Sequence, residues 1–408
     1  MKFPALVLAV LIGASVPGVF AAETTPQHAP PQIREQGFFK GIAAPVIGKR
    51  SDWKLDGYYK NLFFVSRTAD THKRYVADLQ RLRLGVDRTL NDRLRAKVVL
   101  DQDALLHNFR GSQDFRSILN NDQHNLAFVD ADKAYVNSGN LFAEFVLYRA
   151  FVKYDAAPLQ VTVGKQMIDW GRMRFYSPMD LFNPISPFAI DRDERPGVDA
   201  IDIDFFPKDD IHLDTVYAAG RTFSDSSVGS RLLYRWKDYD LFLMGGDFQN
   251  AKVVGGGFDG YLRNAGFRGE FTQTHGDTGR DFFRGVIGLE YAFFTRLSVL
   301  GEYFYNGGAD DSDPAALVDS YRFFTQTLTL KKHLLGLAAE YEIHPLVKAA
   351  NYVLYDAEGT SFFINPEIRY NMRANLDLKG GAQFYCGGSH GEFSENQNIY
   401  YVQLQYFF

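Results

Sequence analysis

The C-terminal segment, residues 398–408, is the part of the sequence that most constrains the fold. Read with the two-residue period of a β-strand, its aliphatic side chains share one face and its glutamines lie on the other. The first face carries Tyr400, Val402, Leu404, Tyr406 and Phe408, and the second carries Tyr401, Gln403, Gln405 and Phe407. If such a strand lies in a membrane, no backbone edge can be left unpaired in lipid, and every other strand must then belong to the same closed ring.

A terminal strand with these two faces, ending on phenylalanine, resembles the closing strand and assembly signal of Gram-negative outer-membrane β-barrels. The resemblance implies a location in the Gram-negative outer membrane, contact with outer-membrane lipid and recognition of Phe408 by the barrel-assembly machinery. The expected fold class is therefore all-β, a transmembrane antiparallel β-barrel.

The N-terminus indicates export from the cytoplasm. Lys2 precedes an apolar run from Leu6 to Val19, and small residues near Ala21 suit cleavage after that position. We expect a signal peptide at residues 1–21, a periplasmic N-terminal segment at 22–50 and an outer-membrane barrel at 51–408. A retained membrane anchor is the alternative, but the run is too short to span a bilayer comfortably.

Overall composition excludes fewer classes than the pattern does. The chain is 46% hydrophobic with a formal net charge of −5, and a barrel reaches such averages by alternating lipid-facing and lumen-facing residues. The 36 Phe and 23 Tyr suit aromatic girdles at the membrane interfaces. The sequence has no basic cluster for nucleic acid, and the single Cys386 offers neither a disulfide nor a haem-attachment motif. We expect no cofactor and no metal.

From about residue 55 onward, strand-like segments alternate with connections that are in turn short and long. We expect eighteen strands, an even number that places both termini on the periplasmic side, with sixteen as the alternative count. A ring of this size encloses a water-filled lumen. A soluble β-sandwich or propeller is the competing class, but neither explains the alternation of short turns and long loops.

Strand alternation also assigns charged side chains to the lumen, because a mid-membrane arginine or lysine facing lipid costs about 2–4 kcal/mol. Early strands contribute mainly basic residues and the strands within 282–343 mainly carboxylates, which predicts a field across the pore. Local ion pairs between strands are the alternative. The strand residues expected to line the pore are Arg81, Arg83, Arg95, Lys97, Arg231, Arg235, Arg268, Glu290, Glu302, Glu340 and Arg369.

Two long loops are expected, at residues 104–139 and 171–197, and the second is the more informative. Its prolines and large apolar residues indicate an ordered segment rather than a solvated one. We expect this extracellular loop to fold into or over the lumen as a constriction, and a cap packed on the rim is the alternative. The selectivity charges of the constriction would be Arg172, Arg174, Arg192, Glu194 and Arg195.

The same region carries a second resemblance. The residues Gly164-Lys165-Gln166, Trp170-Gly171, Pro178, Asp180, Asn183-Pro184 and Arg192-Asp193-Glu194-Arg195-Pro196-Gly197-Val198-Asp199 look like the signature segment of alginate-export-type outer-membrane porins. The resemblance implies an eighteen-stranded channel with an in-folded loop and arginines along the path of an acidic solute.

Together these features predict an outer-membrane porin, monomeric or trimeric, for passive passage of polar, acidic small solutes. Two alternatives use the same barrel: a sleeve for a periplasmic or multihaem partner in a porin–cytochrome electron conduit, and an exporter of an acidic polysaccharide. An enzyme is not expected, because no Gly-x-Ser-x-Gly elbow occurs and the histidines lie mostly in loops or at strand ends.

Overall fold

The structure is a computed structural model. It describes residues 53–112, 114–115, 128–184, 187–190, 195, 197–276, 281–309, 329–388, 390–394 and 396–408. The expected signal peptide and periplasmic segment lie outside these residues. Within the described part of the chain, no helix is long and apolar enough to cross a membrane.

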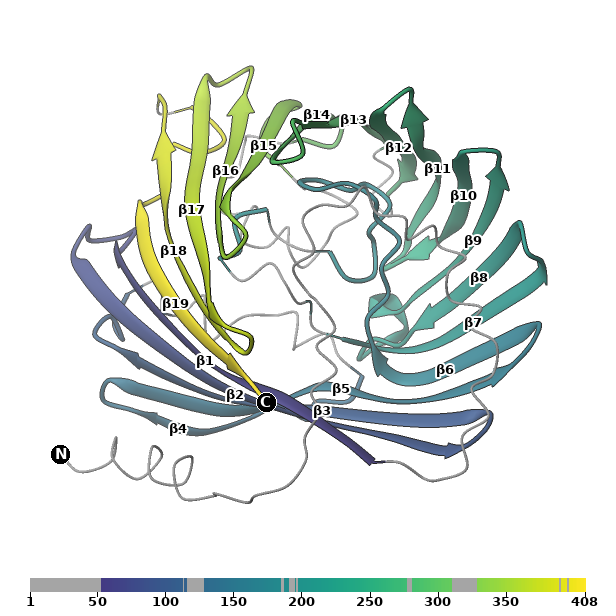
Figure 1. Ribbon diagram of the computed structural model, residues 1–408, viewed down its shortest axis with the longest axis horizontal. Coiled ribbons are helices and arrows are strands. Elements are labelled where there is room, and N and C mark those ends of the chain that lie inside the picture. The colour runs from purple at the N-terminus through teal and green to yellow at the C-terminus, as the bar shows by residue number, and fades with distance from the viewer. Residues whose placement is uncertain are drawn as a thin grey trace. The chain divides into compact units, whose positions relative to one another are not determined.

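Antiparallel strands form a closed barrel (Figure 1). β1 (Trp53–Arg67) pairs along one edge with β2 (Arg74–Asn91) and along the other with β19 (Ile399–Phe407), which closes the ring. The other strands of the ring are β3 (Leu94–His107), β5 (Leu141–Ala156), β6 (Leu159–Gln166), β7 (Val198–Lys208), β8 (Ile211–Ala218), β9 (Ser227–Trp236), β10 (Tyr239–Phe248), β11 (Ala251–Leu262), β12 (Ala265–His275), β13 (Asp281–Phe293), β14 (Leu297–Asn306), β15 (His333–His344), β16 (Val347–Asp356), β17 (Ser361–Arg373) and β18 (Leu376–Cys386). The predicted all-β barrel of eighteen strands is thus confirmed.

The C-terminal strand closes the ring as its alternation predicts. Its register on β1 runs from Tyr58 opposite Phe407 to Val65 opposite Tyr400. The main chain of Gly57 exchanges two hydrogen bonds with that of Phe408, at 3.1 and 3.0 Å. Exposure follows the two faces, with Leu404 38% exposed and its neighbour Gln403 4% exposed.

One strand was not expected. β4 (Lys133–Ser138) lies within the predicted loop 104–139 and pairs with the beginning of β5. The cause is the short β6, which ends at Gln166 rather than near Trp170, so its pairing with β5 begins only at Ala150. β4 pairs with the part of the β5 edge that β6 leaves unpaired, which satisfies backbone groups that would otherwise be exposed.

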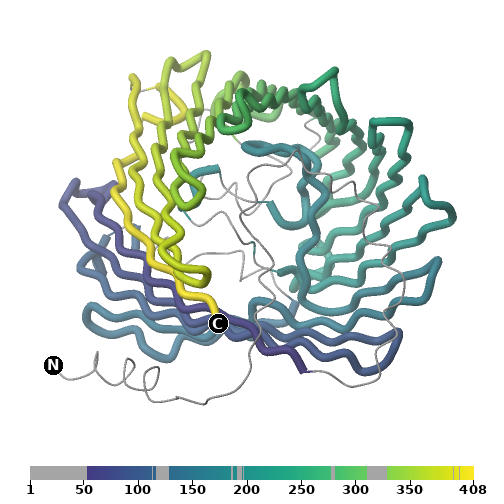
Figure 2. Tube along the Cα trace, viewed as in Figure 1, coloured from purple at the N-terminus to yellow at the C-terminus, as the bar shows by residue number. Residues whose placement is uncertain are grey.

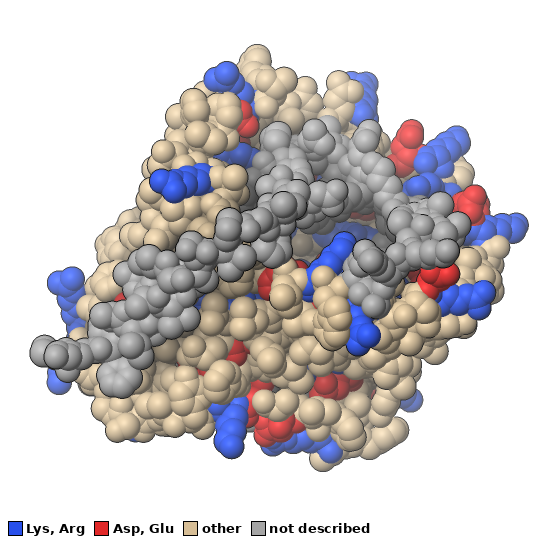
Figure 3. All heavy atoms as spheres, turned by 60° about the horizontal axis from the view of Figure 1, so that its bottom comes forward, with Lys and Arg blue, Asp and Glu red and all other residues tan. Residues whose placement is uncertain are grey.

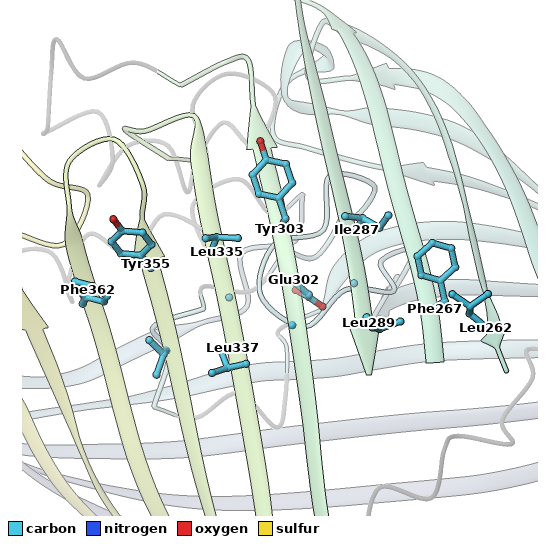
Figure 4. Close-up of a pocket in the computed structure, with 14 residues that line it drawn as sticks. Leu262, Phe267, Ile287, Leu289, Glu302, Tyr303, Leu335, Leu337, Tyr355 and Phe362 are labelled. Carbon is cyan, nitrogen blue, oxygen red and sulfur yellow. The ribbon is translucent and has the colours of Figure 1, made fainter. Parts of the chain in front are cut away.

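The outer face of the wall is apolar. Figure 4 shows outward side chains from β11 to β17, among them Ile287, Tyr303 and Leu335, which line a shallow hollow of about 700 Å³. Glu302 reaches the opposite side of the wall and is only 4% exposed. Such a surface is costly in water and suited to hydrocarbon. On the face seen in Figure 3, basic and acidic side chains are interspersed rather than gathered into patches of one sign.

Loops tie together one end of β15 to β18, which Figure 2 traces in green to yellow. Glu392, in the connection between β18 and β19, accepts hydrogen bonds from the main-chain nitrogens of Leu330 and Lys331, at 2.7 and 2.9 Å. Asp356 accepts from the main-chain nitrogen of Glu392 at 2.9 Å. Burial raises the pKa of Glu392 to about 8, because the two main-chain bonds only partly offset desolvation and Asp356 adds repulsion.

Candidate functional site: the inner wall and the segment between β6 and β7

The segment between β6 and β7, residues 167–197, begins in an apolar cluster. Trp170 is 1% exposed and packs edge-on against Phe182 of the same segment and Phe248 of β10. Its indole Nε1 donates to Asp214 Oδ2 on β8 at 2.7 Å, and Arg231 on β9 donates to its main-chain oxygen at 3.2 Å. The start of the segment is therefore fixed to the inner face of β8, β9 and β10.

Two inner-face carboxylates hold the main chain of the segment. Glu302 on β14 accepts hydrogen bonds from the nitrogens of Arg174 at 2.8 Å and Phe175 at 3.0 Å. Glu270 on β12 accepts from the nitrogen of Arg172 and from the hydroxyl of Ser177. Because a carboxylate accepts only, these two glutamates suit a segment that presents N–H and O–H donors.

Glycine leaves room for this contact on both sides of Glu302. Gly288 and Gly336 pair with Glu302 from the neighbouring strands. A Cβ on Gly336 would clash with the ring of Phe175, and a Cβ on Gly288 would lie 3.1 Å from the Met173 side chain. The row Gly288, Glu302 and Gly336 therefore forms a socket into which the segment fits, and we refer to it as the glycine socket.

A later part of the segment, at Phe188 and Ile190, contacts the inner face of strands on the other side of the barrel. Gln383 and Lys379 of β18 donate to the main-chain oxygens of Phe188 at 2.8 Å and Ile190 at 3.1 Å. The ring of Phe188 packs edge-on against Phe363 of β17. The described parts of the segment thus contact inner-face residues from β8 round to β18.

Within the segment, Arg195 pairs with the fully buried Asp180 and also donates to the main-chain oxygen of Asn183 at 3.2 Å. Burial raises the pKa of Asp180 well above its ordinary value, and the charge of Arg195 opposes that shift. Arg149 on β5 donates to the main-chain oxygen of Arg195. Arg195 therefore holds the segment together, a structural role that the sequence does not predict.

The charged strand residues predicted to line the pore lie on the inner face, mostly paired with neighbouring strands. The pairs are Arg81 with Asp103, Arg83 with Asp101, Arg95 with Asp87, Lys97 with Asp56, Arg231 with Asp214, Arg235 with Asp240, Arg268 with Glu290, Glu340 with Lys348 and Arg369 with Glu367. The basic residues of the early strands therefore have carboxylate partners, as the alternative of local ion pairs predicts. Pairing weakens a field across the lumen, because each neutral pair acts only over a short range.

Three guanidinium groups gather where the segment meets the wall. Arg174 donates to the Tyr352 hydroxyl at 2.9 Å, and Arg369 approaches the same hydroxyl at 3.4 Å. Arg268 approaches the main-chain oxygen of Arg172 at 3.4 Å. Arg268 and Arg369 are also paired with Glu290 and Glu367, whereas the side-chain contacts of Arg174 recorded among the described residues are with Tyr352.

Two predicted selectivity residues, Arg192 and Glu194, lie outside the residues that the structure describes. Two other inner-wall residues were not predicted from the sequence. Tyr148 and Arg149 were missed because a β-bulge in the pairing of β3 with β5 interrupts the alternation there. The guanidinium of Arg83 lies 3.4 Å from the Tyr148 ring centroid, so the bulge adds a cation–π contact to the inner wall.

Comparison with known proteins identifies the fold. No family model and no curated protein matches the sequence. The chain resembles the solved structures of Acinetobacter baumannii OccAB1 (TM-score 0.56) and OccAB4 (0.58), each at 10% identity over 88% of this chain and 96% and 99% of theirs. Pseudomonas aeruginosa OccK5 (OpdH) is similar at TM-score 0.57, with 10% identity over 88% of this chain and 97% of that one. The fold is that of Gram-negative outer-membrane porins.

Proposed function

We propose that this protein is a channel of the Gram-negative outer membrane for passive passage of polar, acidic small solutes, with the segment 167–197 narrowing its lumen. The observation that carries the proposal is the attachment of this segment to inner-face carboxylates, through the main-chain nitrogens of Arg172, Arg174 and Phe175. A segment that only capped the rim of the barrel would not require hydrogen-bond acceptors on the inner face.

The wall supports the location and the transport role. Its outer positions are apolar, as on β9, where Val228, Leu232 and Tyr234 are exposed between buried inward residues. Closure leaves no unpaired strand edge toward lipid, and the inner face carries charged groups that interact with water and polar solutes. A lining of this kind favours polar solutes over apolar ones.

The preference for acidic solutes rests on the guanidinium groups at the segment. Arg174 contacts a tyrosine, through the Tyr352 hydroxyl and the face of its ring at 5.2 Å. A hydroxyl does not neutralise the guanidinium, so its charge, which also attracts the Glu302 carboxylate, can attract an anion. Arg369 also donates to the Tyr352 hydroxyl, and Arg268 donates to the main-chain oxygen of Arg172. Both of these arginines are also paired with glutamates.

A sleeve for a cytochrome fits this geometry less well. The described parts of the segment are attached to inner-face residues on β8, β12, β14 and β18. A protein partner that entered the barrel would have to displace these contacts. On purification in mild detergent, we expect no haem-containing protein to co-purify with the barrel.

Replacement of residues 173–190 by a short Gly–Ser linker tests the constriction. Single-channel conductance in planar bilayers should rise, because the linker lacks the side chains that pack on the wall. The matched control replaces residues 221–225, which include the exposed Phe223, and should leave conductance unchanged. Equal conductance of the first variant and the wild type, with both folded by heat-modifiable gel mobility, would exclude a constricting role.

A further inference from the structure

Three carboxylates meet on the inner face of β7 and β8. Asp204 and Asp214 are directly opposed in the register of the two strands, and Asp202 lies two residues before Asp204. Each offers one oxygen, and these oxygens all lie within 4.8 Å of one another. The intervening residue Ile203 is exposed on the outer face, which confirms that the three acids share the inner one.

Two of these acids have a buried oxygen without a hydrogen-bond donor. Asp214 is 5% exposed, and its Oδ2 accepts from Trp170 and Arg231. Its Oδ1 is buried and, within the described residues, has no donor, and the same holds for Asp202 Oδ1. A buried carboxylate oxygen without a partner is costly, so two of them in one cluster point to a group that binds there.

The surrounding positive charge does not balance the acids. Arg231 on β9 forms an ion pair with Asp214 through Oδ2 at 2.9 Å. Lys153 on β5 attracts Asp202, and His212 contacts Asp204 at 2.7 Å. The three acids therefore face two side chains of permanent positive charge, Arg231 and Lys153, with His212 beside Asp204.

We propose that Asp202, Asp204 and Asp214 bind a hard divalent cation, with Ca²⁺ as the best fit. The donor set consists of oxygens, which Ca²⁺ and Mg²⁺ prefer. Two oxygens bound to one Ca²⁺ at about 2.3–2.6 Å lie at most about 5 Å apart, which the cluster satisfies, and Ca²⁺ tolerates irregular geometry better than Mg²⁺.

The cation would also fix the start of the segment between β6 and β7. Asp214 contributes one oxygen to the cluster while its other oxygen accepts from the indole of Trp170. Binding therefore links β7 and β8 to the residue from which the segment departs. An effect of Ca²⁺ on conductance rests on the proposed channel function, but cation binding itself does not.

Terbium luminescence tests the site directly, because Tb³⁺ replaces Ca²⁺ and is excited by a nearby indole. The protein is refolded into detergent without lipopolysaccharide, and Tb³⁺ alone is titrated. We expect saturable emission at one ion per chain that excess Ca²⁺ abolishes. The chain has 3 Trp, so Trp170→Phe should remove the emission while equilibrium dialysis still detects bound Ca²⁺.

Asp202→Asn is the decisive variant, because Asp202 accepts none of the hydrogen bonds that hold Trp170. It should weaken Tb³⁺ binding at least tenfold, whereas Asp259→Asn, on inner-face β11, should bind as the wild type does. Absence of saturable binding to the folded wild type would overturn the proposal, as would equal binding by Asp202→Asn. If neither the wild type nor Asp202→Asn binds metal and the variant is the more stable of the two, the acids share a proton instead, and this result would also overturn the proposal.

Discussion

Truncation of Glu302 tests whether the glycine socket holds the segment between β6 and β7. Glu302→Ala removes a carboxylate that accepts two main-chain hydrogen bonds, at 2.8 and 3.0 Å. Hydrogen bonds to a charged group contribute about 1.5–3 kcal/mol each, so the attachment should weaken by about 3–6 kcal/mol. Glu270 and the aromatic contacts of Phe175 and Tyr176 remain, so the segment should loosen rather than detach.

The assay is single-channel recording in planar bilayers. Glu302→Ala should give a higher mean conductance and more open-channel noise than the wild type, and Glu302→Gln, which keeps one acceptor oxygen, should fall between them. Glu340→Ala is the matched control, because Glu340 lies on the same inner face and pairs with Lys348 at 3.5 Å. Conductance and noise in folded Glu302→Ala that equal those of the wild type would refute the assignment of Glu302 as an anchor.

Three further predictions follow from individual residues. Gly336→Ala should displace the Phe175 ring from the glycine socket, lower the free energy of unfolding by about 1–3 kcal/mol through overpacking and raise conductance. Gly301→Ala is the control, because a Cβ there would meet open space on the outer face, and it should change neither conductance nor thermal stability. Arg174→Gln should lower the anion-to-cation permeability ratio about fivefold, the effect of about 1 kcal/mol of charge attraction, while Arg95→Gln should have little effect, because Arg95 is paired and more than half exposed; equal reversal potentials would contradict this. The pKa of Glu392 is raised from 4.5 to about 8, so its contribution to stability is complete below 4.5 and is lost as pH rises through 8. The heat-modification midpoint should therefore fall between pH 4.5 and 8 in the wild type but not in Glu392→Gln, and parallel pH profiles would disprove the assignment.

The strand order and the two faces of the wall are predictable because period-two alternation is a local property. The terminal strand illustrates this, since Leu404 and Gln403 occupy the faces that their sequence positions indicate. The inward orientation of Arg83 and Glu302 follows from the same rule. Alternation fails where the chain departs from regular pairing, as at the bulge near Arg149.

Contacts across the lumen are not predictable in this way. Glu302 looks like any other inward acid in the sequence, and its role depends on the donors presented by residues 174 and 175, more than a hundred positions earlier. The partnership of Arg195 with Asp180 is likewise set by how the segment folds on itself. Sequence spacing indicates which face a residue occupies, whereas tertiary structure decides which partner it finds.

The most direct test of the channel function is the current through the mature protein in a planar bilayer, with the reversal potential measured across a KCl gradient. We predict steady ohmic current and a reversal potential of the sign that indicates anion preference, which Arg174→Gln should reduce. Absence of current from a folded barrel would contradict the account of an open channel, and a cation-selective reversal potential would contradict the preference for acidic solutes.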